Sequence, residues 1–255
     1  MIGVFDSGVG GLAVLTEIRR LMPGADLTYV ADRAHAPYGT KRLCEVRQLS
    51  VEVAQLLVEI GATTLVVACN TASAAALETL RSQFPEISVV GMEPAVKPAA
   101  IASASGVIGV FATTATFQGE LFETVVSKHA AGVRVVTAAC PDWVDMVEEG
   151  ETSGRRVEAS IREVVGPVLE SGADTLVLGC THFSFLGPTI SKVVGPNIRV
   201  LDPAPAVAAQ TTRVAGEKGN GSLDFIASGS IEEFENLVDS LTGLERMRRA
   251  LPFSS

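Results

Sequence analysis

Two cysteines stand at matching places in two similar segments of the chain. Cys69 lies in the segment 64–71, TLVVACNT, and Cys180 lies in the segment 175–182, TLVLGCTH, at an offset of 180 − 69 = 111 residues. Each segment is a short apolar run that ends in polar residues, which is typical of a buried parallel strand followed by a helix. Two such strands in related lobes would hold two thiols on opposite sides of one small molecule. That geometry suits a reaction in which one group removes a proton and the other returns one to the opposite face.

The similarity extends beyond the cysteines and indicates an internal duplication. The further matches are 87–90 with 198–201 and 94–96 with 205–207, both at an offset of 111, and 3–5 with 109–111, at an offset of 109 − 3 = 106. The matched segments occur in the same order in both copies. At the smaller offset Ser7 aligns with Thr113, one hydroxyl with another.

Strand and helix patterns alternate along the chain, which predicts an α/β fold. The predicted strands are 2–5, 27–31, 64–68, 87–91, 107–111, 133–137, 175–179, 198–201 and 223–227. The predicted helices are 10–22, 42–60, 71–83, 115–129, 155–171, 204–215 and 231–249. With the duplication, this order predicts two pseudo-symmetric lobes, each a mainly parallel sheet flanked by helices, with the active site in the cleft between them.

Prolines after two strands mark the predicted hinges, near 92–97 and 202–207. Lobe one is then 1–95 plus 208–255, and lobe two is 96–207. Both cysteines fall at the carboxyl ends of strands, where open α/β sheets bind their ligands.

Composition excludes several classes of protein. The chain has 255 residues, 47% of them hydrophobic, and a net charge of −9, which argues against a nucleic-acid partner. Its four cysteines form no C-x-x-C pair, so neither a disulfide framework nor a structural zinc site is expected. No apolar run reaches the roughly 18 residues of a membrane span, and no membrane partner is expected. We therefore expect a cytoplasmic protein with reduced thiols.

The glycine-rich segment after the first strand supports two interpretations. Gly8-x-Gly10-x-x-Ala13, with Asp32 some way on, loosely matches a dinucleotide-binding fingerprint and so allows a nicotinamide-dependent oxidoreductase. Alternatively, the glycines form a tight strand-to-helix turn whose backbone N–H groups can hold a carboxylate. In that case Asp6 points into the cleft together with its neighbour Ser7.

A set of motifs resembles a known family. The motifs are Asp6 to Gly11 (DSGVGG), Pro37-Tyr38-Gly39, Cys69-Asn70-Thr71-Ala72, Glu93-Pro94, Cys140-Pro141 with Glu148, and Leu178-Gly179-Cys180-Thr181-His182. Together and in this order they resemble the cofactor-independent aspartate/glutamate racemase superfamily and, within it, the glutamate racemases. The resemblance implies two α/β lobes with the site between them, no cofactor, and interconversion of L- and D-glutamate to supply D-glutamate for peptidoglycan.

The resemblance also implies roles for residues. Cys69 would take the proton from D-glutamate with help from Asp6, and Cys180 would take it from L-glutamate with help from His182, which Glu148 would orient. Without pyridoxal phosphate, hydrogen-bond donors must stabilise the charge that develops on the substrate. The matched family positions able to do so are Ser7, Tyr38, Gly39, Asn70, Thr71, Thr113, Thr116 and Thr181. We expect helix N-termini just after both cysteines to lower the thiol pKa from about 8.5.

Other interpretations stay open. Cys180 and His182 could ligate a metal, although no third ligand lies nearby in the sequence and no metal is expected. The same scaffold could serve an aspartate racemase or one of broader specificity, or a non-catalytic protein that binds an acidic amino acid. The expected partner is a small-molecule substrate, with a homodimer as one possible assembly.

Some positions depart from the family pattern. They are Arg33 in place of a small polar residue, His35 in place of Arg, Gly119 in place of Ser, and Phe183-Ser184 in place of Tyr-Pro. We also expect Trp143 and the acidic run 148–151 to lie at a helix end that faces solvent.

Overall fold

The structure, a computed structural model, describes residues 1–216, 219–244 and 251–252. Its strands are β1 (Ile2–Asp6), β2 (Leu27–Ala31), β3 (Thr64–Val67), β4 (Ser88–Gly91), β5 (Val107–Ala112), β6 (Arg134–Ala139), β7 (Thr175–Leu178), β8 (Arg199–Leu201), β9 (Leu223–Ala227) and β10 (Leu251–Pro252). Its helices are α1 (Leu12–Leu21), α2 (Leu43–Glu59), α3 (Asn70–Gln83), α4 (Val96–Ala102), α5 (Thr114–Gln118), α6 (Glu120–His129), α7 (Pro141–Glu148), α8 (Arg155–Glu170), α9 (Phe183–Val194), α10 (Ala204–Val214) and α11 (Ile231–Thr242), with short 3-10 helices η1 (Arg33–His35) and η2 (Tyr38–Thr40).

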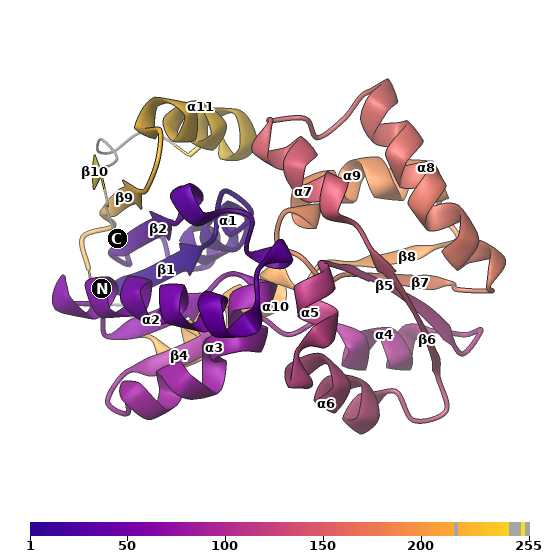
Figure 1. The fold of residues 1–255 in the computed structure, drawn as a ribbon, viewed down its shortest axis with the longest axis horizontal. Helices are drawn as coiled ribbons and strands as arrows, with labels where there is room; N and C mark the ends of the chain where they lie inside the picture. The colour runs from indigo at the N-terminus through magenta and orange to yellow at the C-terminus, as the bar shows by residue number, and fades with distance from the viewer. Residues whose placement is uncertain (217–218, 245–250, 253–255) are drawn as a thin grey trace.

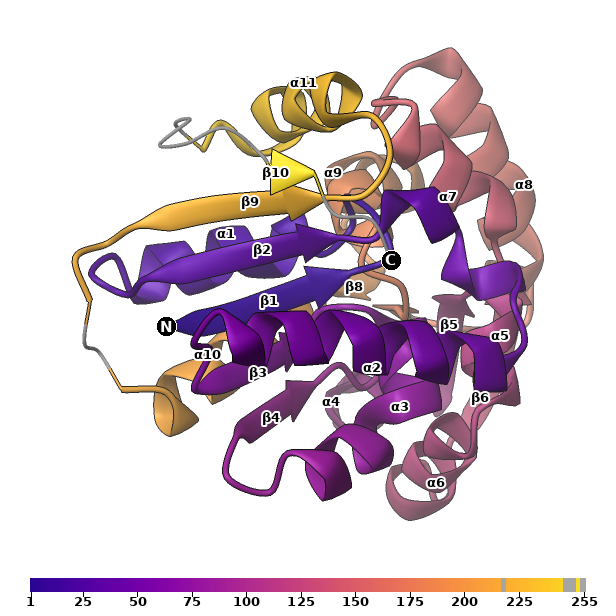
Figure 2. The same ribbon diagram turned by 60° about the vertical axis from the view of Figure 1, so that its left-hand side comes forward.

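The strands form two parallel sheets, as the sequence predicts. The first sheet has the order β10-β9-β2-β1-β3-β4 and the second has the order β6-β5-β7-β8. In Figure 2 the strands of the first sheet point their carboxyl ends toward the second half of the molecule.

The duplication is visible in the strand pairing. The order β2-β1-β3-β4 in the first sheet repeats as β6-β5-β7-β8 in the second. The register repeats too, because Gly3 on β1 pairs with Leu65 on β3, and Gly109 on β5 pairs with Leu176 on β7. The two copies therefore place Cys69 and Cys180 after equivalent strands.

Helices cover both faces of each sheet (Figure 1). On the first sheet, α2 and α3 cover one face, and α1, α10 and α11 the other. On the second sheet, α4 and α6 lie on one face and α7, α8 and α9 on the other. One apolar cluster runs through both halves of the molecule, with Val4 and Leu15 from the first and Phe111 and Ile161 from the second.

Two connections join the sheets, one from β4 to α4 and one from β8 to α10. They coincide with the proline-containing segments 92–97 and 202–207. Because β9 and β10 pair into the first sheet, the chain returns to it after the second connection. The lobe borders at residues 95 and 207 remain predictions, and the second falls inside α10, which packs along α1.

The structure corrects several sequence-based expectations. It contains α4 and α7, which were not predicted, and it gives bounds to the helix expected after Cys180, which is α9. The helix predicted over 115–129 is broken at Gly119 into α5 and α6. The helix predicted over 231–249 ends at Thr242, since Gly243 takes a left-handed conformation with φ 62°; residues 245–249 lie outside the described residues.

Trp143 does not face solvent. It lies on α7 with no exposed surface, and its ring centroid is 5.4 Å from that of Phe111 and 5.1 Å from that of Phe183. Hydrophobic burial of this large ring holds α7 against the second sheet. None of the helices in the described ranges is long and apolar enough to cross a membrane.

Candidate active site between the two sheets

The glycine-rich turn after β1 is wrapped around the carboxylate of Asp6. Asp6 is the last residue of β1 and is fully buried. Its Oδ1 accepts a hydrogen bond from the N–H of Ser7 at 2.8 Å, and its Oδ2 accepts one from the N–H of Gly11 at 2.7 Å. The hydroxyl of Thr181, from the other half of the molecule, lies 3.4 Å from Oδ2. Burial raises the pKa of this carboxyl, although its hydrogen bonds and the charge of His182 oppose the rise.

Cys69 is the residue that caps the N-terminus of α3. Its Sγ accepts a hydrogen bond from the N–H of Ala72 at 3.4 Å and lies 4.0 Å from the hydroxyl of Ser7. The expected lowering of its thiol pKa is wrong. Burial, followed by the charge of Asp6, raises the pKa well above its usual value, and the bond from Ala72 is too weak to reverse this. The charge of Cys180 makes a smaller contribution to the same rise in pKa.

Cys180 belongs to a relay of three side chains. Its Sγ lies 3.7 Å from Nδ1 of His182, and Nε2 of the same ring lies 2.7 Å from Oε1 of Glu148. Burial opposes a charge on His182, but Cys180 and Glu148 outweigh it and raise the imidazole pKa well above 6.5. Burial also opposes the charge on Glu148, but the bond to His182 outweighs it and lowers the pKa of this carboxyl. The imidazole of His182 therefore lies between the Cys180 sulfur and the Glu148 carboxyl group.

The two cysteines differ in their distance from the following helix. Cys69 is itself the N-cap of α3, whereas α9 begins at Phe183 with His182 as its N-cap. A helix therefore begins after each cysteine, as expected, but directly after Cys69 and three residues after Cys180. Next to Cys180 an imidazole takes the position that helix N–H groups take next to Cys69.

The glycine turn packs against the second half of the molecule. A Cβ on Gly8 would collide with the Glu148 carboxylate, and one on Gly10 would lie 2.6 Å from the Thr181 hydroxyl. Asp32, the acidic residue of the dinucleotide fingerprint, is fully engaged, with Oδ2 2.7 Å from the Tyr38 hydroxyl and Oδ1 2.8 Å from another hydroxyl, that of Ser228. These contacts leave little room for a pyrophosphate at the glycines, and Asp32 is already occupied by two hydroxyls and is not free to bind a ribose. The dinucleotide-binding interpretation is therefore disfavoured.

Three threonine hydroxyls form a cluster that bridges the two halves. Oγ1 of Thr71, at the start of α3, lies 3.0 Å from Oγ1 of Thr113 and 3.3 Å from Oγ1 of Thr116, and these last two lie 2.9 Å apart. Gly39 packs directly on Thr113, since a Cβ there would lie 2.7 Å from the Thr113 Cβ. The predicted residues Gly39, Thr71, Thr113 and Thr116 are thus brought together.

Asn70 and Tyr38 have contrasting environments. The side chain of Asn70 is buried, and neither its amide nitrogen nor its amide oxygen has a hydrogen-bond partner. A buried amide without partners costs free energy, so the Asn70 amide has unused capacity to donate and accept hydrogen bonds at this site. Tyr38 is equally buried, but its hydroxyl donates to Asp32, and burial raises its pKa.

One residue that contacts this site was named in the sequence only as a departure from the family pattern. Nε of Arg33 lies 3.4 Å from Oε2 of Glu148, which is 115 residues away in the chain. The other departures lie around the site: Nδ1 of His35 is 2.9 Å from the Asp32 carboxylate, and Ser184 donates to Asp202 at 2.9 Å. A Cβ on Gly119 would lie 2.8 Å from the Cβ of Ala74.

Nothing in the described part of the chain gathers three or more His, Cys, Asp or Glu side chains in a way that could hold a metal ion. The two ring nitrogens of His182 are instead engaged with Cys180 and Glu148.

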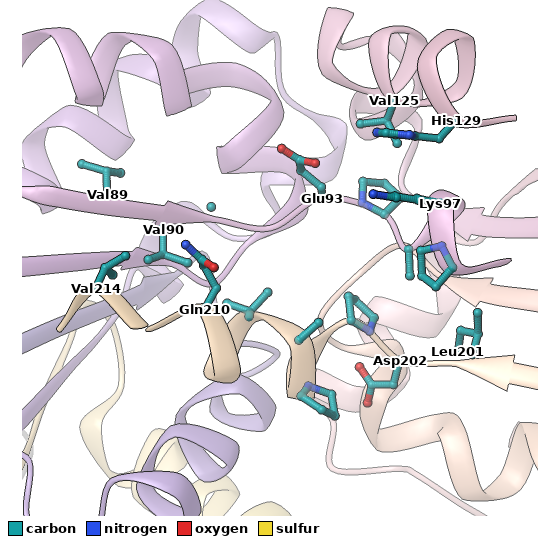
Figure 3. A pocket seen from close by; sticks show the side chains of 18 of the residues that line it. Val89, Val90, Glu93, Lys97, Val125, His129, Leu201, Asp202, Gln210 and Val214 are labelled. Carbon is teal, nitrogen blue, oxygen red and sulfur yellow. The ribbon is translucent and has the colours of Figure 1, made fainter. Parts of the chain in front are cut away.

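A cavity of about 840 Å³ lies at the two connections between the sheets (Figure 3). Glu93 and Lys97 line it from the first connection, and Asp202 from the second. The Glu93-Pro94 motif thus faces this cavity, which neither Cys69 nor Cys180 lines.

Comparisons with known proteins agree on one family. A profile of the family described as Asp/Glu/Hydantoin racemase matches residues 2–211. A glutamate racemase from Roseiflexus sp. (strain RS-1) is 46% identical over 248 residues, which cover 94% of this chain and 91% of that protein. One from Pseudomonas paraeruginosa (strain DSM 24068 / PA7) is 43% identical over 251 residues, which cover 98% and 92%.

Solved structures show the same fold. Glutamate racemase from Francisella tularensis subsp. tularensis SCHU S4, in complex with D-glutamate, aligns with a TM-score of 0.86 at 26% identity, covering 99% of this chain and 97% of that one. The Escherichia coli enzyme, in complex with L-glutamate and the activator UDP-MurNAc-ala, aligns with a TM-score of 0.85 at 28% identity, covering 98% and 96%. With a family profile over most of its length, this chain belongs to the Asp/Glu/Hydantoin racemase family.

Proposed function

We propose that this protein is a glutamate racemase, a cofactor-independent isomerase that interconverts L- and D-glutamate for peptidoglycan synthesis. The observation that carries the proposal is the placement of Cys69 and Cys180 after equivalent strands of the duplicated fold. Both cysteines are buried, and the buried amide of Asn70, the residue after Cys69, has no hydrogen-bond partner among the described residues.

In the proposed reaction each thiol serves one face of Cα. Cys180, as a thiolate beside the His182 imidazolium, removes the Cα proton of L-glutamate. Cys69, as a thiol, delivers its own proton to the opposite face and releases D-glutamate. The reverse reaction exchanges the two roles, so one proton leaves and one arrives in each turnover.

The two thiols have different assistants. His182 is placed to stabilise the Cys180 thiolate, and Glu148 keeps the ring oriented and charged. Asp6 would accept the proton of Cys69; its carboxylate and the Cys69 sulfur both lie beside Ser7, and the charge of Asp6 acts on the Cys69 pKa. Each assistant thus belongs to the half of the molecule that carries its cysteine.

The remaining predicted residues serve the substrate. A carbanion at Cα needs fixed donors around the α-carboxylate, because no cofactor withdraws its electrons. Asn70 offers an unpartnered amide, and Ser7, Thr71, Thr113, Thr116 and Thr181 offer hydroxyls. Tyr38 and Gly39 shape the wall of the site, with the Tyr38 hydroxyl held by Asp32.

The test is circular dichroism of L- and D-glutamate incubated with purified, metal-free protein in D₂O. Racemisation with deuterium incorporated at Cα supports the proposal. Faster turnover of aspartate than of glutamate would favour an aspartate racemase. Binding of glutamate without exchange of its Cα proton for deuterium would favour a non-catalytic binding protein. Activity lost with a chelator and restored by one metal would overturn the cofactor-independent mechanism.

Three further predictions belong with this proposal. The protein acts in the cytoplasm, where free thiols stay reduced. A homodimer is one assembly to be tested by light scattering. The lobes divide at residues 95 and 207, and they must separate to admit substrate, because both cysteines are buried.

A further inference from the structure

Arg33 reaches from one half of the molecule to the other. It opens η1, just after β2 of the first sheet, and its Nε lies 3.4 Å from Oε2 of Glu148 on α7. Both side chains are largely shielded from water, with 14% of Arg33 and 18% of Glu148 exposed. An ion pair in such a place is screened less than one at the surface.

Glu148 is held by donors from both halves. Its Oε1 accepts a hydrogen bond from the N–H of Val9 at 2.8 Å and lies 2.7 Å from Nε2 of His182. Val9 and Arg33 belong to the first half, whereas His182 and Glu148 belong to the second. The carboxylate therefore gains this set of partners only when the two halves are together.

We infer that Arg33 is a positioning residue for the reaction: it locks Glu148 against His182 when the halves close, and so completes the relay of Cys180 only in the closed molecule. The inference rests on the proposed function, because it assigns a role in the same reaction.

The backing of Arg33 suits this role. Its Nη1 lies 3.3 Å from the carbonyl oxygen of Ser230 and 3.7 Å from the exposed carboxylate of Glu233. The guanidinium is thus held on its far side by the Ser230 carbonyl at the start of α11 while its Nε faces Glu148. The exposed Glu233 carboxylate contributes little to this placement, because water screens its charge. The planar fork of donors of Arg33 fixes direction, which the single ammonium of Lys cannot do as well.

The consequence is one-sided. Without Arg33, the Glu148 carboxylate is held through Oε1 alone and can rotate. This rotation shifts the orientation of the His182 ring and slows proton removal by Cys180. Among the described residues, no hydrogen bond joins Glu148 to Cys69 or to its neighbour Ser7. Closure also becomes less favourable, so the KM for glutamate rises as well.

The test compares wild type, Arg33→Gln, Arg33→Lys and Glu148→Gln, alone and combined. Its readout is elimination from L- and D-glutamate analogues with a leaving group at Cβ, which needs only proton removal by one thiol. Arg33→Gln should slow elimination from the L-analogue about tenfold, a typical coupling between contacting charges, with little change for the D-analogue. Arg33→Lys should restore part of the rate, and Arg33→Gln should add nothing in the Glu148→Gln background.

Two matched controls separate this role from general effects. Glu233→Gln removes only the exposed partner of Arg33, and Arg20→Gln removes a surface arginine paired with Glu17. Both should leave all rates unchanged, with Tm and circular dichroism showing intact folds. If Arg33→Gln fails to fold, the elimination rates of Arg33→Lys, measured with and without Glu148→Gln, test the inference instead.

Some results would overturn the inference. Equal slowing of both analogues, no slowing at all, or full additivity with Glu148→Gln would each show that Arg33 does not act through Glu148. If the wild type racemises glutamate and Arg33→Gln has the same elimination rates as the wild type, the inference about Arg33 is wrong but the proposed function stands. A wild type without racemisation defeats the proposed function instead.

Discussion

Oε1 of Glu148 lies 2.7 Å from Nε2 of His182, so the carboxylate of α7 fixes the ring that stands beside Cys180. An ionised carboxylate can only accept hydrogen bonds, so Nε2 of His182 must carry a proton. The other ring nitrogen, Nδ1, faces the sulfur of Cys180. Cys69 has no imidazole neighbour of this kind and is flanked instead by Ser7 and the N–H of Ala72. The duplicated fold thus gives its two cysteines different neighbours.

Glu148→Gln should change stability in a defined pH window. The raised pKa of His182 stabilises the folded state fully below pH 6.5, and this is lost as pH rises through the folded-state pKa. The lowered pKa of Glu148 stabilises it above pH 4.5, and this is lost as pH falls through the folded-state pKa. The difference in free energy of unfolding between wild type and Glu148→Gln should therefore be largest between pH 4.5 and pH 6.5.

Urea unfolding across the pH range measures this difference. Glu149→Gln is the control, because Glu149 is exposed and pairs with Arg156 at the surface. A difference that grows steadily above pH 6.5 would contradict the assignment of the imidazolium to His182.

Cys69→Ser and Cys180→Ser should each suppress racemisation by orders of magnitude while the fold stays intact. A two-base site cannot run with one base missing, and a serine hydroxyl is a far weaker acid than a thiol. The circular-dichroism assay measures the rates. Cys44→Ser, which changes an exposed cysteine on α2, should behave as wild type. Near-normal rates in either site variant would exclude the two-thiol mechanism.

Asn70→Ala should weaken glutamate binding without destabilising the protein. Its amide is buried without partners, so removing it relieves a cost of about 1–3 kcal/mol that offsets the lost packing. The KM for glutamate should rise about tenfold or more, as expected for a lost hydrogen bond to a charged group. Urea unfolding and steady-state kinetics provide the two readouts.

Ser73→Ala is the matched control for Asn70→Ala. Its hydroxyl donates to the carbonyl of Val67 and accepts from the N–H of Met92, so this variant should lose stability by about 1 kcal/mol. Clear destabilisation by Asn70→Ala would mean that the amide has partners within the protein.

Strands β1 to β9 were predicted from the sequence, whereas β10 and several helices were not. Strands such as β3 and β7 are continuous β-branched runs, and their matching cysteines revealed the duplication. The helices α4 and α7 were missed because they have only 7 and 8 residues, too few to show a clear helical period. The extent of α9 is hidden by its Gly187-Pro188 pair, which is a usual turn signal. Packing on the second sheet overrides that local preference.

The candidate site was predictable where it follows the repeat or the motifs, as with Cys69, Cys180 and His182. The contact of Arg33 with Glu148 was not, because the two residues lie in unrelated segments and meet only through the packing of the two halves. The rise in the Cys69 pKa was also missed, since burial is a property of the folded molecule.

Gly39→Ala should act as a wedge between the halves. A Cβ at this position would lie 2.7 Å from the Cβ and Cγ2 of Thr113, closer than atoms can approach. We expect kcat/KM to fall at least about tenfold, because a misplacement of 1 Å at a site is costly, while Tm changes little. Gly24→Ala, where a Cβ meets nothing within 4 Å, should be indistinguishable from wild type in both measurements. Unchanged kinetics for Gly39→Ala would show that closure at this contact is unnecessary.

The two assistants should be sensitive to the direction of the reaction. Asp6 belongs to β1 beside the Cys69 side of the site, and His182 lies 3.7 Å from the thiol of Cys180. Asp6→Asn should therefore impair proton removal from D-glutamate more, and His182→Asn proton removal from L-glutamate more. The kcat/KM values for the two directions stay tied by an equilibrium constant near unity, so the asymmetry must be sought in primary deuterium isotope effects measured separately from each enantiomer. A larger isotope effect in the impaired direction is expected for each variant, because proton removal there becomes more rate-limiting. Equal isotope effects in both directions for both variants would show that Asp6 and His182 act on the site as a whole.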